Sequence, residues 1–335
     1  MRSKPRPSVT EIAAAAGVSA MSVSNALRGN NHVSAATRAK ILRVAKRLGY
    51  QPDPLLTHLM HHVRSRRIRH TQANLGVLLL NDDAYSKRLM AGVEERAGHL
   101  GYAMDKIAPE PFDGNPAGFT RMLQARGIEG LLLPTARTPR SLAAMLDWSQ
   151  FSTVAMTYSV TEPRFHRVVP HGFHNAFLVL QTLRARGYRR PTFAINRGVE
   201  LRANYAYAGA VAAEAQLAGQ PALPPFVSDA ASPHGLAGVG AWFRKHQPDA
   251  LILTGARHVK NELLPELGAA TIARLGLAVL DYDPAYPIAG IDQKTDLLGA
   301  TAVDLLVAQL HRQERGLPID PVVSMVEGRW VEAEK

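Results

Sequence analysis

The sequence predicts an α/β protein with a small all-helical unit at its N-terminus, and three observations support this prediction. Three short amphipathic helical stretches fill the first 50 residues. From residue 74 onward, apolar runs of strand length alternate with helical stretches, which is typical of parallel sheets covered by helices. Positive charge is segregated: residues 1–72 hold 13 of the 39 Lys and Arg residues but 2 of the 28 acidic residues, which leaves 26 of each in the remaining chain.

The N-terminal unit begins with two short helices joined by a tight turn. Ser8 and Glu11 have the spacing of a capping box, so we expect a helix to start at Ser8. It should end at Gly17, a residue suited to the positive φ of a turn. Ser19 then caps a second helix over residues 20–27. Helical periodicity turns one face of each helix inward, with Ile12, Ala13, Ala16, Val23, Ala26 and Leu27 in the expected core.

A third helix completes this unit, from its cap Ser34 to Leu48, with Gly49 at its end. Its expected core positions include Leu48. Three short helices with a glycine in the first turn describe a helix-turn-helix, whose second helix enters the major groove of DNA. A protein-docking module is the alternative for three helices. The segregated positive charge favours double-stranded DNA, since Lys and Arg displace counterions from phosphates. The other expected core residues of this helix are Ile41, Val44 and Ala45.

The residues of this unit resemble the headpiece of the lactose-repressor (LacI) family of transcriptional regulators. The signatures of that family, T-x-x-D-V-A-x-x-A-G-V-S-x-x-T-V-S and H-V-S-x-x-T-R, are matched with conservative exchanges by SVTEIAAAAGVSAMSVSNALRGNNHVSAATR. The resemblance implies that Ala20, Met21 and Asn25 contact base edges. It also implies phosphate contacts from short polar residues near helix starts, namely Ser8, Ser19, Ser22, Ser24, His32, Ser34 and Thr37.

Asn25 departs from the Arg that many members of the family carry at this position. An Arg fork suits guanine, whereas an Asn amide suits N6 and N7 of adenine. We therefore predict an A·T pair at the operator position that Asn25 faces. Ala20 and Met21 offer only apolar contacts, for example to a thymine methyl group.

Residues 51–73 are predicted to form a hinge helix and a basic linker. Prolines 52 and 54 favour an extended turn, after which a short helix can run from residue 55 to about residue 63. The resemblance implies that Leu59 of this helix inserts into the minor groove and kinks the duplex. Packing against the hinge of a partner chain is the alternative role of Leu59, and the two are compatible. No Cys or carboxylate completes a ligand set, so we expect no metal at His58, His61 and His62.

Residues 74–335 are predicted to form two lobes with parallel sheets. The expected strands are the apolar runs 75–80, 130–133, 153–156, 192–195, 250–253 and 277–280. The expected helices between them are 86–100, 173–186, 202–218 and 296–312. The order resembles the effector domain of the same family, which has the fold of periplasmic sugar-binding proteins and a ligand cleft between its lobes. We expect lobes of residues 74–168 plus 295–318, and of residues 169–292 plus 319–335.

The resemblance also implies a small-molecule effector in this cleft, such as a sugar, a sugar derivative or a nucleobase. Arg202 matches the arginine that clamps the ligand in the family, and Asp283 or Asp281 matches a late aspartate that often binds sugar hydroxyls. Ion pairs that stabilise the lobes are the alternative role for these residues. Family aspartates are absent around His171 and at Thr254-Gly255. His171 itself and Asn81 complete the expected set of effector-binding residues.

These features predict a ligand-responsive transcriptional regulator, with repression as the expected action. We expect it to bind a near-palindromic operator as a homodimer, because a single small headpiece buries too little interface for tight specific binding. A constitutive DNA-binding regulator with a vestigial pocket is one alternative. A small-molecule binding protein is another, and it leaves the basic headpiece unexplained.

Enzymatic activity and membrane association are not expected. The sequence lacks a P-loop, a G-x-S-x-G elbow, a G-x-G-x-x-G turn and an H-E-x-x-H motif. It also has no cysteine, which excludes thiolate chemistry and disulfides. We therefore expect no cofactor. No apolar run approaches the roughly 20 residues of a membrane span, and the N-terminal stretch fails as a secretory signal. A cytoplasmic location with no membrane partner is the corresponding expectation.

Overall fold

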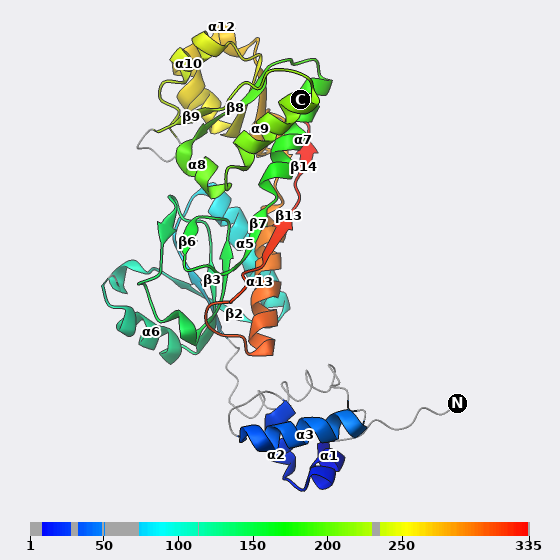
Figure 1. Cartoon of the computed structure of the whole chain (residues 1–335). Helices are drawn as coiled ribbons and strands as arrows, with labels where there is room; N and C mark the ends of the chain where they lie inside the picture. Colours follow the sequence, from blue (N-terminus) through cyan, green and yellow to red (C-terminus); the bar gives the residue numbers. More distant parts are fainter. Residues whose placement is uncertain are drawn as a thin grey trace. The chain divides into compact units, whose positions relative to one another are not determined.

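The computed structural model describes residues 9–27, 33–48, 50, 74–112, 114–229 and 235–333. The chain divides into two compact units, Met1–Thr71 and Gln72–Lys335, which we call the helical unit and the effector unit (Figure 1). Ser8, His32, the expected hinge helix with Leu59, and the basic linker lie outside the described residues.

The helical unit contains the three expected helices, α1 (Val9–Ala16), α2 (Ala20–Leu27) and α3 (Ala35–Leu48). Each helix contributes small or β-branched apolar side chains to one shared core. Leu48, which was expected in this core, is instead 38% exposed because it lies on the outer face of the last turn of α3. The buried residues of the core are Ile12, Ala13, Ala16, Val23, Ala26, Ile41, Val44 and Ala45.

The first lobe of the effector unit is built on a parallel six-stranded sheet of order β13-β7-β5-β3-β1-β2. The strands are β1 (Asn74–Leu78), β2 (Ala103–Ile107), β3 (Ile128–Leu133), β5 (Ser152–Met156), β7 (His166–Pro170) and β13 (Val323–Val326). Helices α5 (Ala84–His99) and α13 (Thr295–Arg312) cover one face, and α6 (Pro116–Ala125) covers the other. The strand side chains alternate between the two faces: Leu75 and Val77 pack with α5 and α13, whereas Leu78 packs with α6.

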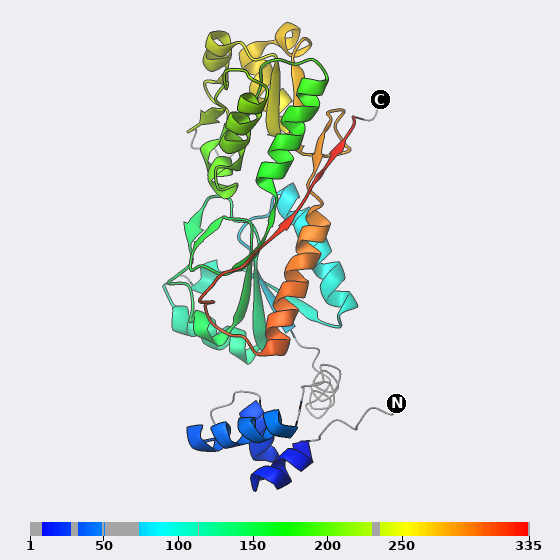
Figure 2. The same cartoon turned by 45° about the vertical axis from the view of Figure 1, so that its right-hand side comes forward.

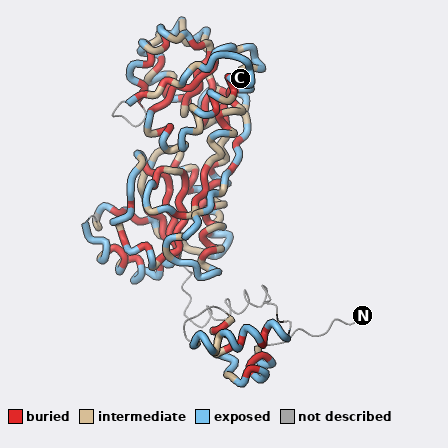
Figure 3. The backbone as a smooth tube through the Cα atoms, in the orientation of Figure 1, coloured by how far each residue is buried: buried red, intermediate tan, exposed pale blue. Residues whose placement is uncertain are grey.

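The second lobe has a similar plan, with a sheet of order β14-β12-β11-β10-β8-β9 that is parallel except for the edge strand β14, which runs antiparallel to β12. Its strands are β8 (Pro191–Asn196), β9 (Phe226–Ser228), β10 (Ala250–Gly255), β11 (Gly276–Asp281), β12 (Gly290–Asp292) and β14 (Arg329–Val331). Helices α7 (Gly172–Ala185) and α9 (Ala206–Leu217) pack on one face, and α10 (Val239–His246) packs on the other. Both sheets lie in the interior of their lobes, where buried positions are concentrated (Figure 3). The fold is therefore the predicted α/β class.

Short elements complete the described part of the effector unit. In the first lobe they are η1 (Glu110–Phe112), η2 (Trp148–Gln150) and the pair β4 (Arg140–Ser141) and β6 (Val160–Glu162). In the second lobe they are α8 (Arg197–Arg202), η3 (Val259–Leu263), α11 (Leu264–Leu267) and α12 (Ala269–Ile272). Among the described residues, no helix has the combined length and apolar character that spanning a membrane requires.

Two boundaries differ from those expected from the sequence. The helix predicted over 202–218 starts only at Ala206, with α9, and Arg202 ends the preceding α8, because Asn204 and Tyr205 adopt left-handed φ angles of 54° and 61° that a right-handed helix does not contain. Residues 323–326 were expected in the second lobe, but β13 pairs in parallel with β7 and so belongs to the first. The chain thus makes its last crossing between β13 and β14, which run from one lobe into the other (Figure 2).

Two of the crossings between the lobes are joined by hydrogen bonds. The backbone N–H of His171, on the first crossing, donates to the carbonyl of Val326 over 2.8 Å. Gly328, on the last crossing, donates its N–H to Oδ1 of Asn175 over 2.9 Å. A Cβ atom at Gly328 would lie 2.6 Å from the side chain of Ile291, so glycine is the residue that fits there. These contacts place the first and last crossings at one hinge.

Helices α5 and α13 approach each other closely at two glycines. A Cβ atom added to Gly299 of α13 would lie 2.3 Å from the carbonyl oxygen of Leu89, and one added to Gly92 of α5 would lie 2.0 Å from that of Asp296. Both contacts are with backbone atoms, which cannot rotate away. This approach fixes α5, which carries residues of the cavity described below.

Replacing Gly299 with Ala should therefore destabilise the effector unit by about 3 kcal/mol, at the upper end of what overpacking costs. All three tryptophans, Trp148, Trp242 and Trp330, lie in this unit, so denaturant unfolding followed by their fluorescence measures the change. Gly98→Ala is the control, because Gly98 lies on α5 with no atom within 4 Å of its added Cβ. It should raise stability by about 0.5–1 kcal/mol. Equal effects of the two substitutions would contradict the role of the close approach.

Candidate nucleic-acid interface and ligand cavity

The turn between α1 and α2 is fixed by backbone hydrogen bonds at Gly17. Gly17 has a φ of 64° and donates its N–H to the carbonyl of Ala14 over 3.3 Å. Val18 donates to the carbonyl of Ala13 over 3.1 Å and packs against the core of the unit. These two bonds form a Schellman motif, which ends α1 and sets the direction of the chain into α2. The sequence signal for this turn was the glycine, and the structure confirms it.

Helix α2 buries one face and leaves the other free of the core. Val23 and Ala26 are 0% and 3% exposed, and they anchor the helix to α1 and α3. On the remaining surface Ala20 is exposed, Asn25 is half-buried and Met21 is 65% exposed. The three residues expected to contact bases therefore lie outside the core of the unit.

The starts of α2 and α3 have the same arrangement of hydroxyl groups. Ser19 Oγ accepts a hydrogen bond from the backbone N–H of Ser22 over 3.1 Å, and the two hydroxyls are 2.9 Å apart. Ser34 Oγ accepts from the N–H of Thr37 over 3.3 Å, with 2.8 Å between those hydroxyls. Hydroxyls and N–H groups at a helix N-terminus favour an anion. The side chain of Ser24, also expected at a phosphate, lies outside the described residues.

Positive charge in the described part of this unit is concentrated on α3. The helix has five basic residues and no acidic residue. Most of them are exposed, and the Nε of Arg43 donates to the carbonyl of Ala39 over 3.3 Å. An unbalanced row of Lys and Arg is the electrostatic signature of a protein surface for nucleic acid. The five residues are Arg38, Lys40, Arg43, Lys46 and Arg47.

The second candidate site is a cavity of about 520 Å³ in the effector unit, lined by residues of both lobes. This volume is in the range of sites for small molecules. All five residues that the sequence analysis expected there line it, namely Asn81, His171, Arg202, Asp281 and Asp283. Sequence reasoning missed four polar neighbours in the same lining, which are Asp83, Tyr85, Arg88 and Tyr207.

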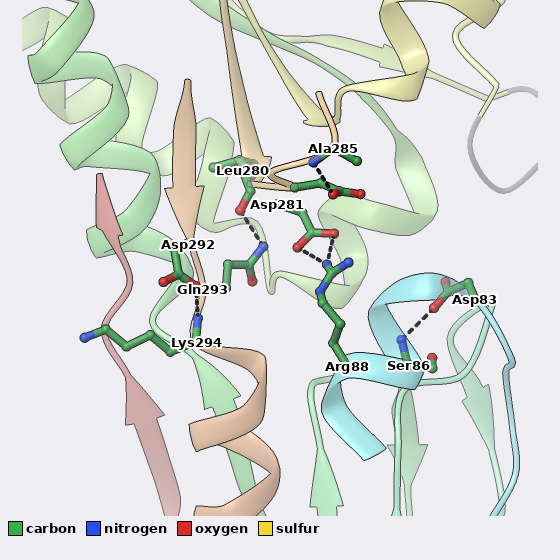
Figure 4. A network of polar contacts seen from close by, with 10 residues as sticks. Asp83, Ser86, Arg88, Leu280, Asp281, Ala285, Asp292, Gln293 and Lys294 are labelled. Atoms are coloured by element: carbon green, nitrogen blue, oxygen red, sulfur yellow. Dashed lines mark hydrogen bonds and ion pairs between the residues drawn. The ribbon is translucent and has the colours of Figure 1, made fainter. Parts of the chain in front are cut away.

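An ion pair joins the two lobes at this cavity. Arg88 of α5 places Nη2 at 2.5 and 2.6 Å from the two carboxylate oxygens of Asp281, which ends β11 (Figure 4). Burial raises the pKa of Asp281 above its ordinary range, while the charge of Arg88 acts in the opposite direction. The alternative role considered for Asp281, an ion pair between lobes, is thus present. No pattern in the sequence separates Arg88 from the exposed Lys87 beside it.

Arg202 also reaches across to the first lobe, but to a neutral group. Its Nη1 donates to the carbonyl of Arg137 over 2.5 Å. Burial lowers the pKa of Arg202, although an arginine stays protonated at any physiological pH. Desolvation raises the pKa of Tyr85 and of Tyr207, so both phenols keep their protons and can donate hydrogen bonds.

The remaining expected residues each hold a local turn or helix start. His171 caps α7 by accepting the N–H of His174 at Nδ1 over 3.2 Å, so its neutral ring carries the proton on Nε2. Asn81 donates to Oδ2 of Asp83 over 2.8 Å. Asp283 accepts the N–H of Ala285 over 3.0 Å. These side chains are thereby fixed in position along the cavity.

The loop between α8 and α9 brings strained backbone to the cavity. Asn204 and Tyr205 both line it with left-handed φ angles, which cost free energy in residues other than glycine. Tyr205 provides no side-chain cap for α9. Instead, the buried Glu200 accepts the N–H of Ala208, in the first turn of α9, over 3.0 Å. Strain of this kind is typical of segments that clamp a ligand.

No group of three or more His, Asp or Glu side chains among the described residues is arranged to hold a metal ion. His58, His61 and His62 lie outside that part of the chain.

A helix-turn-helix unit followed by two parallel-sheet lobes around a cavity defines a class of transcriptional regulator with a periplasmic-binding-protein-like domain. The family model described as "Bacterial regulatory proteins, lacI family" matches residues 8–53, the segment that contains α1, α2 and α3. This segment of the chain therefore matches the helix-turn-helix of the LacI family of transcriptional regulators.

Known relatives resemble the chain over different lengths. The repressor PurR of Pectobacterium carotovorum is 26% identical over 184 residues, which cover 54% of this chain and 52% of PurR. The chain thus matches about half the length of such relatives. The regulator PtxS of Pseudomonas plecoglossicida is 27% identical over 332 residues, with 92% of this chain and 91% of PtxS covered.

Solved structures share the fold along the whole chain. A lac repressor dimer bound to operator and the anti-inducer ONPF has a TM-score of 0.56 at 17% identity, with 98% of both chains covered. A complex of the regulator CelR with cellobiose has a TM-score of 0.58 at 19% identity and covers 98% of this chain and 99% of CelR.

The ion pair between Arg88 and Asp281 leads to a prediction about lobe stability. Arg88→Met should cost about 1–2 kcal/mol, because it leaves a mostly buried carboxylate without its counter-ion. The cost is limited because the side chain of Arg88 is 37% exposed. Asp281→Asn should cost less, and the double variant should be no less stable than Arg88→Met alone. Unfolding followed by tryptophan fluorescence measures all three, with the exposed Lys87→Met as control. Additive costs would show that the pair contributes nothing.

Proposed function

We propose that the protein regulates transcription in the cytoplasm by binding a near-palindromic operator as a homodimer, with repression as its action. The observation that carries this proposal is in the helical unit. The exposed surface of α2, the hydroxyl-lined helix starts and the row of basic residues on α3 all occur within the segment that matches the family model. Repression is supported by the names of the PurR relatives.

The proposed DNA contacts are of two chemical kinds, contacts to base edges and contacts to phosphates. Ala20, Met21 and Asn25 would face base edges in the major groove, where donor and acceptor patterns distinguish the base pairs. The hydroxyls at the starts of α2 and α3 would contact phosphates and fix the register of the helix. Ser8, Ser24 and His32 at phosphates and Leu59 in the minor groove are proposed on the family resemblance.

The proposed ligand site is the cavity of the effector unit. Residues of both lobes line it, so a bound molecule would have a different affinity for different lobe arrangements, which is the free energy that regulation requires. One solved relative, the regulator CelR, holds the sugar cellobiose. We therefore propose a small polar effector of the size of a sugar or a nucleobase.

One observation favours a second candidate, a constitutive regulator. Arg88 and Asp281 already join the lobes in this structure, and Asp281 is one of the two aspartates expected to bind a ligand hydroxyl. A chain held together by its own ion pair would bind its operator without an effector.

Selection of bound DNA from a random pool by the full chain tests the proposed function. The selection is repeated with and without a panel of sugars and nucleobases. We expect a two-fold symmetric motif whose occupancy changes with one class of ligand. An unchanged occupancy throughout the panel would favour the constitutive candidate. Enrichment of no motif would falsify the proposed function.

Asn25→Arg should change the base preference at one position of each half-site. The wild-type chain should prefer an A·T pair there and the variant a G·C pair, with discrimination of about 1–3 kcal/mol in each case if the contact is bidentate. Competition binding with operators that differ only at this pair measures the preference. Lys46→Ala on α3 is the control, and it should weaken binding to all operators alike and reduce the salt dependence. A preference of the wild-type chain for G·C would contradict the assignment of Asn25.

A further inference from the structure

The carboxylates of the cavity are already engaged by donors of the protein. Asp83 accepts hydrogen bonds from the side chain of Asn81 and from the N–H of Ser86, each over 2.8 Å. Asp281 is paired with Arg88, and Asp283 accepts the N–H of Ala285 (Figure 4). Donors of the protein thus occupy part of the accepting capacity of all three carboxylates, which a neutral sugar would need for its hydroxyl protons.

Arg202 of the same cavity, in contrast, has no carboxylate as a hydrogen-bond partner among the described residues. No carboxylate of the described residues lies within 4.0 Å of Arg202, whose polar partner in that part of the chain is the carbonyl of Arg137. The guanidinium has five N–H groups, so most of them are left for another acceptor. Burial lowers the pKa of Arg202, whereas the electrostatic effects of Tyr207, Asp83 and Tyr85 raise it. Asp83 is the carboxylate among these three, and it accepts hydrogen bonds from Asn81 and Ser86.

Other donors line the cavity beside Arg202. Arg257 has no ion pair or hydrogen bond with the described residues and lies exposed at the cavity. Arg137 lies 4.0 Å from an exposed Asp82, too far for a strong pair. The Nε2 proton of His171 and the phenol of Tyr207 add further neutral donors. Arg202 and Arg257 therefore offer the cavity charged donors that no ion pair with the described residues engages.

We propose that the effector of this cavity is an organic anion of sugar size, whose carboxylate or phosphate group pairs with Arg202. The inference rests on the proposed effector function of the site and specifies its ligand. A partly buried cation without a counter-ion is costly, and an anionic ligand removes that cost, whereas a neutral ligand deepens the burial without compensation. A guanidinium fork matches the two oxygens of a carboxylate or phosphate. Aromatic side chains of the lining can cover the carbon skeleton, among them Tyr158, Phe173, Tyr205 and Tyr286.

Calorimetric titration of the full chain with gluconate, glucuronate, glucose 6-phosphate and glucose tests this proposal. At least one anion should bind ten times more tightly than glucose, and its affinity should fall as salt is raised. Binding of gluconate or glucuronate would identify a carboxylate ligand, and binding of glucose 6-phosphate alone a phosphate ester. Glucose binding as tight as that of the anions, or no binding by any of the four, would overturn the proposal.

Two substitutions of Arg202 distinguish an ion pair between Arg202 and the anion from a general effect on the lobes. Arg202→Gln should weaken binding of the anion at least tenfold, while Arg202→Lys should recover part of the loss because it restores the charge. Arg274→Gln removes an exposed arginine outside the cavity and should leave affinity unchanged. Anion binding that is insensitive to Arg202→Gln would also overturn the proposal. Operator selection with the same preparation distinguishes a failure of this inference from a failure of the proposed function. An enriched DNA motif without anion binding would contradict the anionic effector but would still support DNA recognition.

Discussion

The effector unit depends on one ion pair between its two lobes, in which Arg88 neutralises the charge of Asp281. Arg88 and Asp281 come from different lobes, and each would be costly in the cavity without the other. Their pairing ties α5 to the end of β11 and leaves Arg202 as a cation whose partner is a backbone carbonyl. The pairing of charges in the cavity thus determines both the contact between the lobes and the class of ligand that we propose for the cavity.

The fold provides this arrangement through the positions of element ends. In parallel sheets the carboxyl ends of the strands lie at one edge, where ligands of α/β proteins bind. Asp281 ends β11, and the first crossing between lobes follows β7, where His171 begins α7. The glycines at 92 and 299 allow α5 to pack closely against α13, and Arg88 projects from this closely packed helix. Packing far from the cavity therefore sets the geometry within it.

Much of this architecture could be predicted because its signals are local. The three helices of the headpiece follow from caps, a glycine turn and periodicity, and each of the six expected apolar runs overlaps an observed strand, although the run 75–80 extends two residues beyond the end of β1. Other strands of the two sheets escaped prediction, namely β2, β7, β9, β12, β13 and β14. For the edge strand β13 the reason is that Val323 and Met325 remain exposed, so its sequence lacks the apolar pattern of a buried strand. The break at Asn204 and Tyr205 escaped because neither residue is a glycine or proline, and the interruption is stabilised by Glu200 through a tertiary hydrogen bond.

The role of Arg88 could not be read from the sequence for a more general reason. Pairing across lobes joins residues 193 positions apart, and its free energy depends on the burial of Asp281 rather than on any local motif. A ligand can shift the lobes only by its differential affinity for their arrangements. Because the protein already supplies one ion pair across the cavity, an effector must either add a contact that this pair does not make or replace the pair itself. An anion on Arg202 does the first without disturbing Asp281, whereas a neutral sugar on Asp281 must compete with Arg88 for the same oxygens.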